Sequence, residues 1–426
     1  MLSRDENELL TRVGPGTPTG ELFRCFWLPV LLSEELPRAD SDPLRVRILG
    51  EDLIAFRDTQ GQVGLVHNNC PHRGASLFFG RNEEGGLRCV YHGWKFDASG
   101  ACVDMPNELA ESDFKSKVKA VAYPTNERGG LVWAYMGPPE HRPAPPDLEF
   151  TQVPDSHHYV TKYPLDCNYM QGMEGELDSS HVSFLHSTLK PDQNRLNNRV
   201  LGQNLLELTA RDGHPRFTVV DSDAGLVIGA SREVGDGTLY WRITQWLMPC
   251  YTLVPGDPNG TLLCQIRIPI DDEHHWLFRL RWNAFRPLPD DEVRIYRQGG
   301  GFYATQIPGS YQTLANSSND YLIDRQKQKT VNYSGLESVP IEDTAMMESM
   351  GPIYDRGQEH LGSSDVAVIS TRRRLMKLAT DLREGVEPFA ASHPELYRVR
   401  SAVKVLAREV PFLEGASELL LSRTGA

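Results

Sequence analysis

The stretch Cys70-Pro-His72, followed by Cys89-Val-Tyr-His92, decides the fold of this chain. Sixteen residues separate the two pairs, and each pair lies at a turn between short strand-like segments. Thiolates and imidazoles are the side chains that bind zinc ions and iron–sulfur clusters. The sequence therefore predicts a small β-rich unit in which two loops close on one metal centre.

The spacing of these residues leaves two kinds of metal centre open. Two thiolates and two imidazoles can hold a structural zinc ion tetrahedrally. Alternatively, the thiolates bind one iron of a [2Fe–2S] cluster and the imidazoles bind the other, which raises its potential and makes it a mild one-electron donor. A zinc-bound binding module without catalysis is thus the non-enzymatic alternative, and the colour of the purified protein would separate the two.

The residues around the candidate ligands resemble a known family. Cys70-Pro-His-Arg-Gly-Ala75 and Cys89-x-x-His-Gly-Trp-Lys-Phe96 are similar to the Rieske ferredoxin domain of ring-hydroxylating oxygenases. The resemblance implies a Rieske [2Fe–2S] cluster held by Cys70, His72, Cys89 and His92. It covers nearly the whole chain and is closest to the oxygenase α subunits of the phthalate 4,5-dioxygenase-like group.

A second group of potential ligands is Asp178-x-x-His181-x-x-x-x-His186. Non-haem iron oxygenases bind Fe(II) through two histidines and one carboxylate on one face, which leaves positions for O₂ and substrate. We expect a helix over residues 168–185, on which Glu174, Asp178 and His181 share one side. His186 would point elsewhere on an ideal helix, so a helix end or a local distortion must bring it to the metal.

The family resemblance implies roles for these residues. His181 and His186 match the mononuclear iron ligands. Asp178 matches the bridging carboxylate, which hydrogen-bonds to His181 and, across a subunit boundary, to the cluster ligand His92 of the partner subunit. Ser179 is expected to lie near the substrate pocket. Glu174 stands where other ring-hydroxylating dioxygenases often carry asparagine, and the sequence gives it no role.

The third iron ligand must be a carboxylate from a distant part of the chain. Asp343 is followed by Met346, Met347 and Met350 at helical spacing, which predicts a carboxylate buried on an apolar helix face and in need of a charged partner. The segment around it also resembles the third-ligand segment of the family. We therefore expect Asp343 to be the ligand. The other candidates lie in polar contexts: Asp320, Asp324, Asp355 and Asp365.

The pattern along the chain predicts an α+β fold. Short strands within residues 27–140 predict an all-β Rieske domain, which a proline-rich linker follows. Strands grouped between helices predict a catalytic domain over residues 147–426, built on an antiparallel sheet. The resemblance implies that this sheet is curved, as in helix-grip (START-like) folds, and that a helical segment, residues 1–26, packs on the catalytic domain.

Composition and charge limit the partners of this protein. Of its 426 residues, 40% are hydrophobic and 24% are charged, and the net charge of -13 argues against nucleic acid or an anionic membrane. No apolar run reaches the ~18 residues of a membrane span. Seven cysteines and an N-terminus unlike a signal peptide favour a reduced, cytoplasmic protein. An anionic substrate would need a local basic group, for which Arg232 and Arg242 are candidates.

The resemblance also implies a function. We expect a terminal oxygenase that uses O₂ and reductase-supplied electrons to hydroxylate an aromatic carboxylate, as in phthalate ring dihydroxylation. An O-demethylase of a methoxylated aromatic acid is the alternative. Besides the cluster, a mononuclear Fe(II) is implied. The implied partners are a flavin/iron–sulfur reductase or a ferredoxin, with NADH or NADPH as the electron source, and further copies of the chain in a homotrimer or stacked hexamer.

Overall fold

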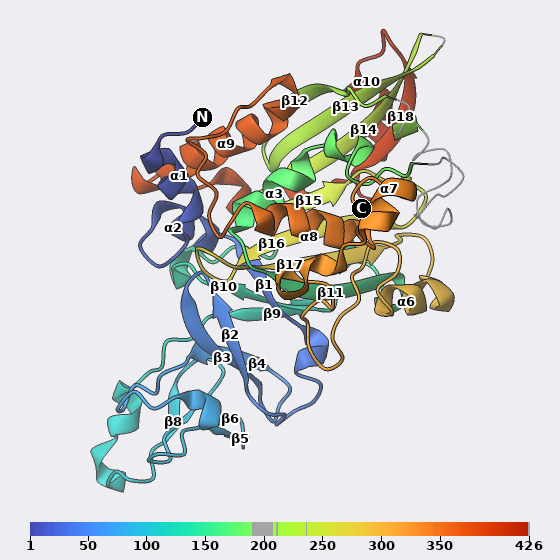
Figure 1. Ribbon diagram of the computed structural model, residues 1–426. Coiled ribbons are helices and arrows are strands. Elements are labelled where there is room, and N and C mark those ends of the chain that lie inside the picture. Colours follow the sequence, from blue (N-terminus) through green and yellow to red (C-terminus); the bar gives the residue numbers. More distant parts are fainter. Residues whose placement is uncertain (190–207, 210–211, 236, 425–426) are drawn as a thin grey trace.

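The computed structural model describes residues 1–189, 208–209, 212–235 and 237–424. Figure 1 shows a narrow β-rich part, at the bottom of the view, and a larger part above it in which helices lie against a broad sheet. None of the described helices combines the length and the apolar character that a membrane span requires.

Three small antiparallel sheets form the β-rich part, with the orders β1-β10-β9, β2-β3-β4 and β5-β6-β7-β8. An apolar core of its own joins the last two sheets and includes Cys70, Cys89 and Trp94. The strands are β1 (Trp27–Leu32), β2 (Leu44–Ile48), β3 (Glu51–Arg57), β4 (Val63–His67), β5 (Arg81–Glu83), β6 (Gly86–Arg88), β7 (Lys95–Phe96), β8 (Cys102–Asp104), β9 (Thr125–Arg128) and β10 (Leu131–Tyr135).

The larger part is built on an eight-stranded antiparallel sheet. The order is β11-β17-β16-β15-β14-β13-β12, and β18 pairs with β14. In β16 and β17 nearly every residue is buried, because both faces of these strands are covered. The strands are β11 (His158–Leu165), β12 (Arg216–Ser222), β13 (Gly225–Gly235), β14 (Thr238–Leu247), β15 (Tyr251–Val254), β16 (Leu262–Pro269), β17 (His275–Trp282) and β18 (Ala402–Ala407).

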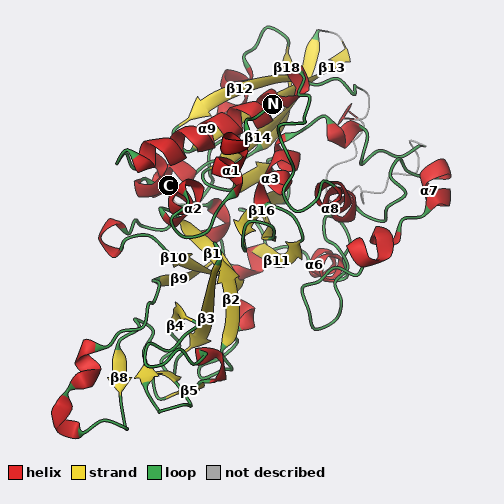
Figure 2. Cartoon of the chain, turned by 60° about the vertical axis from the view of Figure 1, so that its left-hand side comes forward, coloured by secondary structure: helices red, strands yellow, loops and turns green. Residues whose placement is uncertain are grey.

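Helices pack against this sheet and against one another. Helix α3 contacts β15, β16 and α8, and the N-terminal helices α1 and α2 contact α9. Figure 2 shows α1, α2 and α9 grouped on the larger part, away from the β-rich end. The helices are α1 (Arg4–Thr11), α2 (Pro18–Arg24), α3 (Tyr169–Leu177), α6 (Asp290–Arg297), α7 (Arg325–Thr330), α8 (Val339–Ser349), α9 (Val366–Arg383) and α10 (Phe412–Ala416).

The helix that we expected over residues 168–185 is shorter than predicted. Helix α3 ends at Leu177, and Asp178 takes an extended conformation as its C-cap. The Asp178 carboxylate accepts hydrogen bonds from the backbone N–H groups of Ser180 and His181, at 2.7 and 3.3 Å. Such a local bond competes with continuation of the helix, so the chain turns and re-enters a short 3-10 helix, His181–Ser183.

Candidate active site

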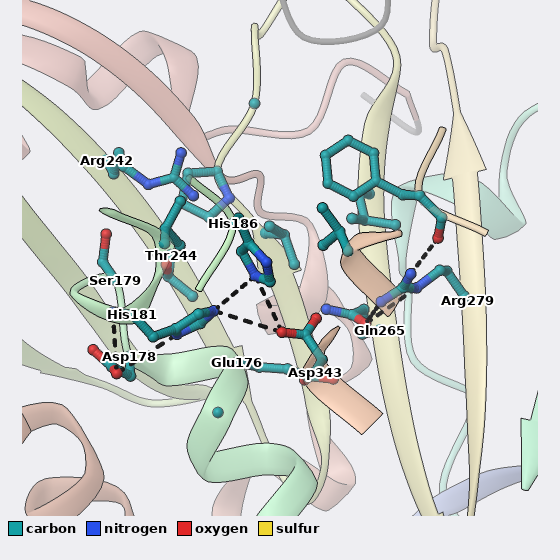
Figure 3. A pocket seen from close by; sticks show the side chains of 18 of the residues that line it. Glu176, Asp178, Ser179, His181, His186, Arg242, Thr244, Gln265, Arg279 and Asp343 are labelled. Atoms are coloured by element: carbon teal, nitrogen blue, oxygen red, sulfur yellow. Dashed lines mark hydrogen bonds and ion pairs between the residues drawn. The ribbon is translucent and has the colours of Figure 1, made fainter. Parts of the chain in front are cut away.

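Two neighbouring histidines and one carboxylate from a distant part of the chain converge on one point. The Nε2 atoms of His181 and His186 lie 3.2 Å apart, and Oδ1 of Asp343 lies 3.1 Å from Nε2 of His186 and 3.7 Å from Nε2 of His181. Figure 3 shows the three side chains pointing toward one another at the edge of a pocket. Two imidazoles and one carboxylate on one side of a point are the donor set of non-haem iron oxygenases.

The break after α3 places the second histidine. Because the helix ends at Leu177 and only a 3-10 turn follows, His186 comes back toward His181. The local distortion required by the five-residue spacing is therefore present. Asp343 arrives from α8, which packs against α3.

Each histidine has a carboxylate behind it, and the two carboxylates differ. Nδ1 of His186 lies 2.7 Å from Oε2 of Glu342, whose side chain is completely buried and also accepts a hydrogen bond from the Ser334 hydroxyl. Nδ1 of His181 lies 3.5 Å from Oδ2 of Asp178, which is about one quarter exposed (26%). A carboxylate behind a histidine fixes its tautomer and orients Nε2 toward a metal. Glu342 was not predicted from the sequence.

The charges of this group depend on one another. Burial by itself would lower the pKa of His186, but Asp343 and Glu342 outweigh burial and raise it to about 9. Burial would raise the pKa of Asp343, but His186 and then His181 outweigh it and lower it to about 2. This group of side chains therefore keeps the Asp343 carboxylate and the His186 imidazolium together, and a divalent cation could replace the proton of the imidazolium.

The burial of Asp343 has a different basis from the one that we inferred. The stripe Met346, Met347 and Met350 was expected to face the core, but Met346 and Met350 are 43% and 47% exposed. Only Met347 is buried, and it lines the pocket together with Asp343. The helix was therefore predicted correctly, whereas the apolar face was wrong. None of the other aspartates considered belongs to this group of described side chains.

One pocket lies next to the three side chains. Ser179 and Arg242 line it, as expected, and so do Thr244 on β14 and the bridging candidate Asp178. Its apolar wall comes from Val182, Val254, Leu263, Phe302, Val339 and Met347. A pocket that combines polar and apolar side chains next to the three converging side chains suits an aromatic ligand with polar substituents.

Arg232 does not belong to the lining of this pocket. Its guanidinium donates to the backbone oxygen of Ser179 at 2.6 Å, to the Ser179 and Ser183 hydroxyls, and to the backbone oxygen of Asp212. It therefore holds the chain beside the histidines instead of facing a ligand. The expectation that Arg232 contacts substrate is corrected accordingly.

Several polar residues of the pocket were not predicted from the sequence, and three of them lie on neighbouring strands of the sheet. Gln265 on β16 and Arg279 and Arg281 on β17 line it. The signal was present in Arg279-Leu-Arg281, because alternate residues of a strand share one face and two arginines on the inner face of an apolar strand are unusual. Without knowing which face of β17 is covered, that signal could not be assigned to a site.

Glu174 lies on α3 but does not face the histidines. It forms ion pairs with Arg356 at 2.8 Å and with Arg372 of α9 at 2.7 Å. The two arginines outweigh burial and lower the pKa of Glu174. The expectation that Glu174 shares a side with His181 was wrong, since the helix ends before His181. Its place is in a buried ion-pair group that joins α3 to α9.

The two candidate cluster loops repeat one backbone pattern. Gly74 N–H donates to the carbonyl of Cys70, and Gly93 N–H donates to the carbonyl of Cys89, each at 2.9 Å. Each cysteine N–H in turn donates to the residue after the glycine, Ala75 or Trp94, at 2.8 Å. Both glycines have positive φ, which glycine adopts without strain. The four candidate ligands thus project from two similar tight loops.

The two histidines of these loops form one pair of side chains, and the two cysteines form another. The rings of His72 and His92 lie 4.4 Å apart, and His72 stacks on Trp94. Cys70 and Cys89 are both buried. Burial is the main reason why the pKa of the Cys70 thiol is raised to about 11. A bound cation is therefore required to keep Cys70 as a thiolate.

The positions of the ligand atoms bear on the two metal centres that the spacing left open. The ligand atoms of a tetrahedral zinc site lie within about 4 Å of one another. Among the described residues, His181, His186 and Asp343 form the one group of three or more such side chains with ligand atoms all within 4.8 Å. The cysteines and histidines of the two loops do not belong to that group, and a cluster with two irons, one held by thiolates and the other by imidazoles, does not require a single common centre.

Comparisons with known families cover both parts of the chain. A model described as the Rieske [2Fe-2S] domain matches residues 26–120, and a model described as "LigXa C-terminal domain like" matches residues 134–413. The oxygenase subunit of 3-chlorobenzoate-3,4-dioxygenase from Comamonas testosteroni is 40% identical over 390 residues, which are 88% of each chain. The chain belongs to the Rieske non-haem iron oxygenases. The predicted family and the enzymatic class are thereby confirmed.

Other relatives place this Rieske oxygenase more closely. The phthalate 4,5-dioxygenase oxygenase subunit of Pseudomonas putida is 38% identical over 394 residues, 90% of this chain and 88% of the relative. A tert-butanol monooxygenase / tert-amyl alcohol desaturase oxygenase subunit of Aquincola tertiaricarbonis is 35% identical over 377 residues, 86% of this chain and 75% of the relative. The chain is thus an α subunit of the phthalate 4,5-dioxygenase-like group.

Solved structures support the α+β fold. The crystal structure of dicamba monooxygenase bound to dicamba superimposes with a TM-score of 0.58 over 85% of this chain and 99% of that one, at 20% sequence identity. Rieske oxygenases of this kind carry a [2Fe–2S] cluster and a mononuclear iron and receive electrons from a reductase, so the predicted cofactors are confirmed at the level of the family.

Proposed function

We propose that this Rieske oxygenase is a terminal oxygenase that hydroxylates an aromatic carboxylate. Family membership alone does not fix the substrate, because one relative is named for an alcohol. The observation that supports an acidic substrate is the position of Arg242, whose guanidinium lies in the pocket beside the side chains proposed to bind iron. Its Nε has no hydrogen-bond partner, and none of the ion pairs among the described residues includes it. A substrate carboxylate would supply the missing partner.

In this proposal each site residue has a defined task. Cys70, His72, Cys89 and His92 hold the cluster, and His181, His186 and Asp343 hold the iron. When bound, the iron supplies the activation of O₂, and the cluster supplies electrons one at a time. Glu342 keeps Nε2 of His186 aimed at the iron, and the apolar wall of the pocket excludes water and orients the ring.

Asp178 would connect the two metal sites between subunits. Its carboxylate lies 3.5 Å from His181 and is about one quarter exposed, so a second contact from outside the subunit is possible. We propose that His92 of the partner subunit makes this contact in a homotrimer or a stacked hexamer. A flavin/iron–sulfur reductase or ferredoxin, supplied by NADH or NADPH, would then reduce the cluster.

Turnover against a panel of acids tests the proposed function. The purified oxygenase, with an added reductase, is incubated with benzoate, phthalate, methoxybenzoates and the neutral benzamide, and O₂ uptake and product mass are followed. We expect uptake with at least one acid and little with benzamide. Activity confined to the neutral benzamide would contradict the proposed function.

The products of the same panel separate ring dihydroxylation from O-demethylation. Ring dihydroxylation adds two oxygen atoms to the substrate, whereas hydroxylation of a methoxy carbon releases formaldehyde and a phenol. Both outcomes keep the acid-binding role of Arg242. An Arg242→Gln variant should lose affinity for the accepted acid by about 10-fold or more, as expected for a charge-assisted hydrogen bond.

A further inference from the structure

Two neighbouring arginines of β17 also face the pocket. Arg279 and Arg281 both line it, and each is only 1% exposed. They are two residues apart on one strand, so they share the face that α3 and α8 cover. Figure 3 shows Arg279 on the opposite side of His186 and Asp343 from Arg242.

Several other buried arginines of the described structure are neutralised by glutamates. Arg267 lies 2.6 Å from Glu176, Arg356 lies 2.8 Å from Glu174, and Arg400 lies 2.8 Å from Glu149. This is the usual condition for a guanidinium removed from water, because an unpaired buried charge is strongly destabilising. Arg279 and Arg281 have no such carboxylate among the ion pairs of the described residues. The buried Arg232 shares this feature, but all three of its guanidinium nitrogens donate to neutral oxygens of the protein.

The two arginines differ in how far hydrogen bonds to neutral groups compensate for the missing carboxylate. Arg279 donates to the side-chain oxygen of Gln265, its partner across the strands, with two nitrogens, and to the backbone oxygen of Phe302. Three of its nitrogens are thus engaged with fixed oxygens. Arg279 is therefore held in place and has little capacity left for a ligand.

Arg281 has nearly all of its hydrogen-bonding capacity left for a ligand. Among the described residues its single hydrogen bond is long, 3.4 Å from Nη1 to the Tyr296 hydroxyl, and its buried Nε has no partner there. The Tyr296 hydroxyl donates its own hydrogen to Glu292, so it can only accept from Arg281. The guanidinium carbon lies 4.7 Å from the centre of the Phe302 ring and 5.6 Å from that of Tyr296. These rings hold the group in place without neutralising its charge.

We propose that Arg281 is a second anion-binding position of this pocket, which takes an acidic group of the aromatic substrate separately from Arg242. The inference rests on the proposed function and extends it to a second substituent of the ring. Strand β17 is three strands from β14 in the sheet, so the two backbones lie roughly 14 Å apart where β14 pairs with β15, and Arg242 lies just beyond that pairing, where β14 pairs with β18. Two long side chains that reach inward from this separation can contact opposite substituents of one aromatic ring.

Binding measurements on the anaerobic holoenzyme test this proposal without turnover. The probes are benzamide, benzoate and the three benzenedicarboxylates, and the readout is the ratio of Kd for benzoate to Kd for the tightest dicarboxylate. We expect a ratio of about 10 or more for the wild type, as expected for one additional charge-assisted contact. In Arg281→Met the ratio should fall to about 1, because a single anion position remains.

Two further variants make the result specific. Arg281→Lys keeps a charge without the planar fork and should give an intermediate ratio; it also replaces the methionine variant if that one does not fold. Arg294→Gln, an exposed arginine of the adjacent α6, should leave the ratio unchanged. A ratio that is the same in Arg281→Met and in the wild type would overturn the proposal, whatever happens to the absolute affinities.

The experiment separates failure of this inference from failure of the proposed function. If the wild type binds benzoate but no dicarboxylate more tightly, the second anion position is wrong and the proposed acid hydroxylation stands. If the wild type binds benzamide as tightly as every acid, both are wrong. If the ratio falls selectively in Arg281→Met, both are supported.

Discussion

The loops proposed to hold the cluster and the side chains proposed to hold the iron bring their ligands together in different ways. Cys70, His72, Cys89 and His92 come from two adjacent loops with the same backbone hydrogen bonds and a glycine at the same place. His186 and Asp343 are 157 positions apart and meet only because α8 packs on α3. The first site depends on local turn geometry, whereas the second depends on the packing of two helices and a sheet.

This difference predicts that the two metal sites can be lost separately. Asp343→Ala removes the carboxylate from the iron site and leaves the β-rich part unchanged. We expect the iron content to fall from about three to about two per chain, with the visible absorption of the cluster retained and turnover abolished. Loss of the cluster spectrum in this variant would show that the sites are not independent.

Asp178→Asn tests whether the two sites cooperate after assembly. We expect both metals to remain bound and turnover to fall by about 100-fold, because the carboxylate proposed to link them is lost. Reduction of the cluster by the reductase should stay at the wild-type rate in stopped-flow absorption. Normal product formation in this variant would exclude the bridging role.

Glu342→Gln tests the long-range support of the iron site. Glu342 lies 2.7 Å from Nδ1 of His186 and is completely buried. We expect the affinity for Fe(II), or for Co(II) as a spectroscopic substitute, to fall about 10-fold or more, because the imidazole is less well oriented. Glu337→Gln, an exposed glutamate in the segment before α8, is the matched control and should bind metal normally. Unchanged affinity in Glu342→Gln would mean that helix packing alone positions His186.

Gly93→Ala tests the local support of the cluster. Gly93 has a φ of +82°, and an added Cβ would lie 2.6 Å from Cγ of Pro106. Gly61 has a φ of +87° with open space around it, so Gly61→Ala carries only the backbone cost of about 1 kcal/mol. We expect Gly93→Ala to lose more stability than Gly61→Ala and also to lose cluster absorption. Equal behaviour of the two variants would contradict a steric requirement at Gly93.

The metal affinity of the iron site should also depend on pH, over a range that is set by the effect of the neighbouring carboxylates on the pKa of His186. The pKa of His186 in the metal-free protein is raised to about 9, so below this pH the imidazolium has no lone pair for a metal. Co(II) affinity should therefore rise with pH up to about 9 and then level off, with the release of about one proton at pH 7. Calorimetry in buffers of different ionisation enthalpy measures this proton, and no release at pH 7 would contradict the assignment.

The sequence was informative where function depends on local spacing. The cluster loops could be predicted because ligands and glycines lie within one short stretch, and turn geometry depends on neighbours in the chain. His181 and His186 were recognised by resemblance to the family, while the end of α3 that brings them together comes from hydrogen bonds of Asp178 that compete with the helix. The choice of Asp343 agrees with the geometry, although two of the methionines invoked for it are exposed.

By itself, the sequence determined the family, the α+β class and the kinds of metal ligand, because these are written in residue types at fixed short spacings. Only the tertiary structure decided which charges are paired. It gave Glu174 its two arginines and Glu342 its histidine, and it turned Arg232 away from the pocket. Among the described residues, it left the Nε atoms of Arg242 and Arg281 without a hydrogen-bond partner. The reason is physical: whether a buried charge meets a partner depends on which strands and helices face each other, and residues distant in the chain determine that.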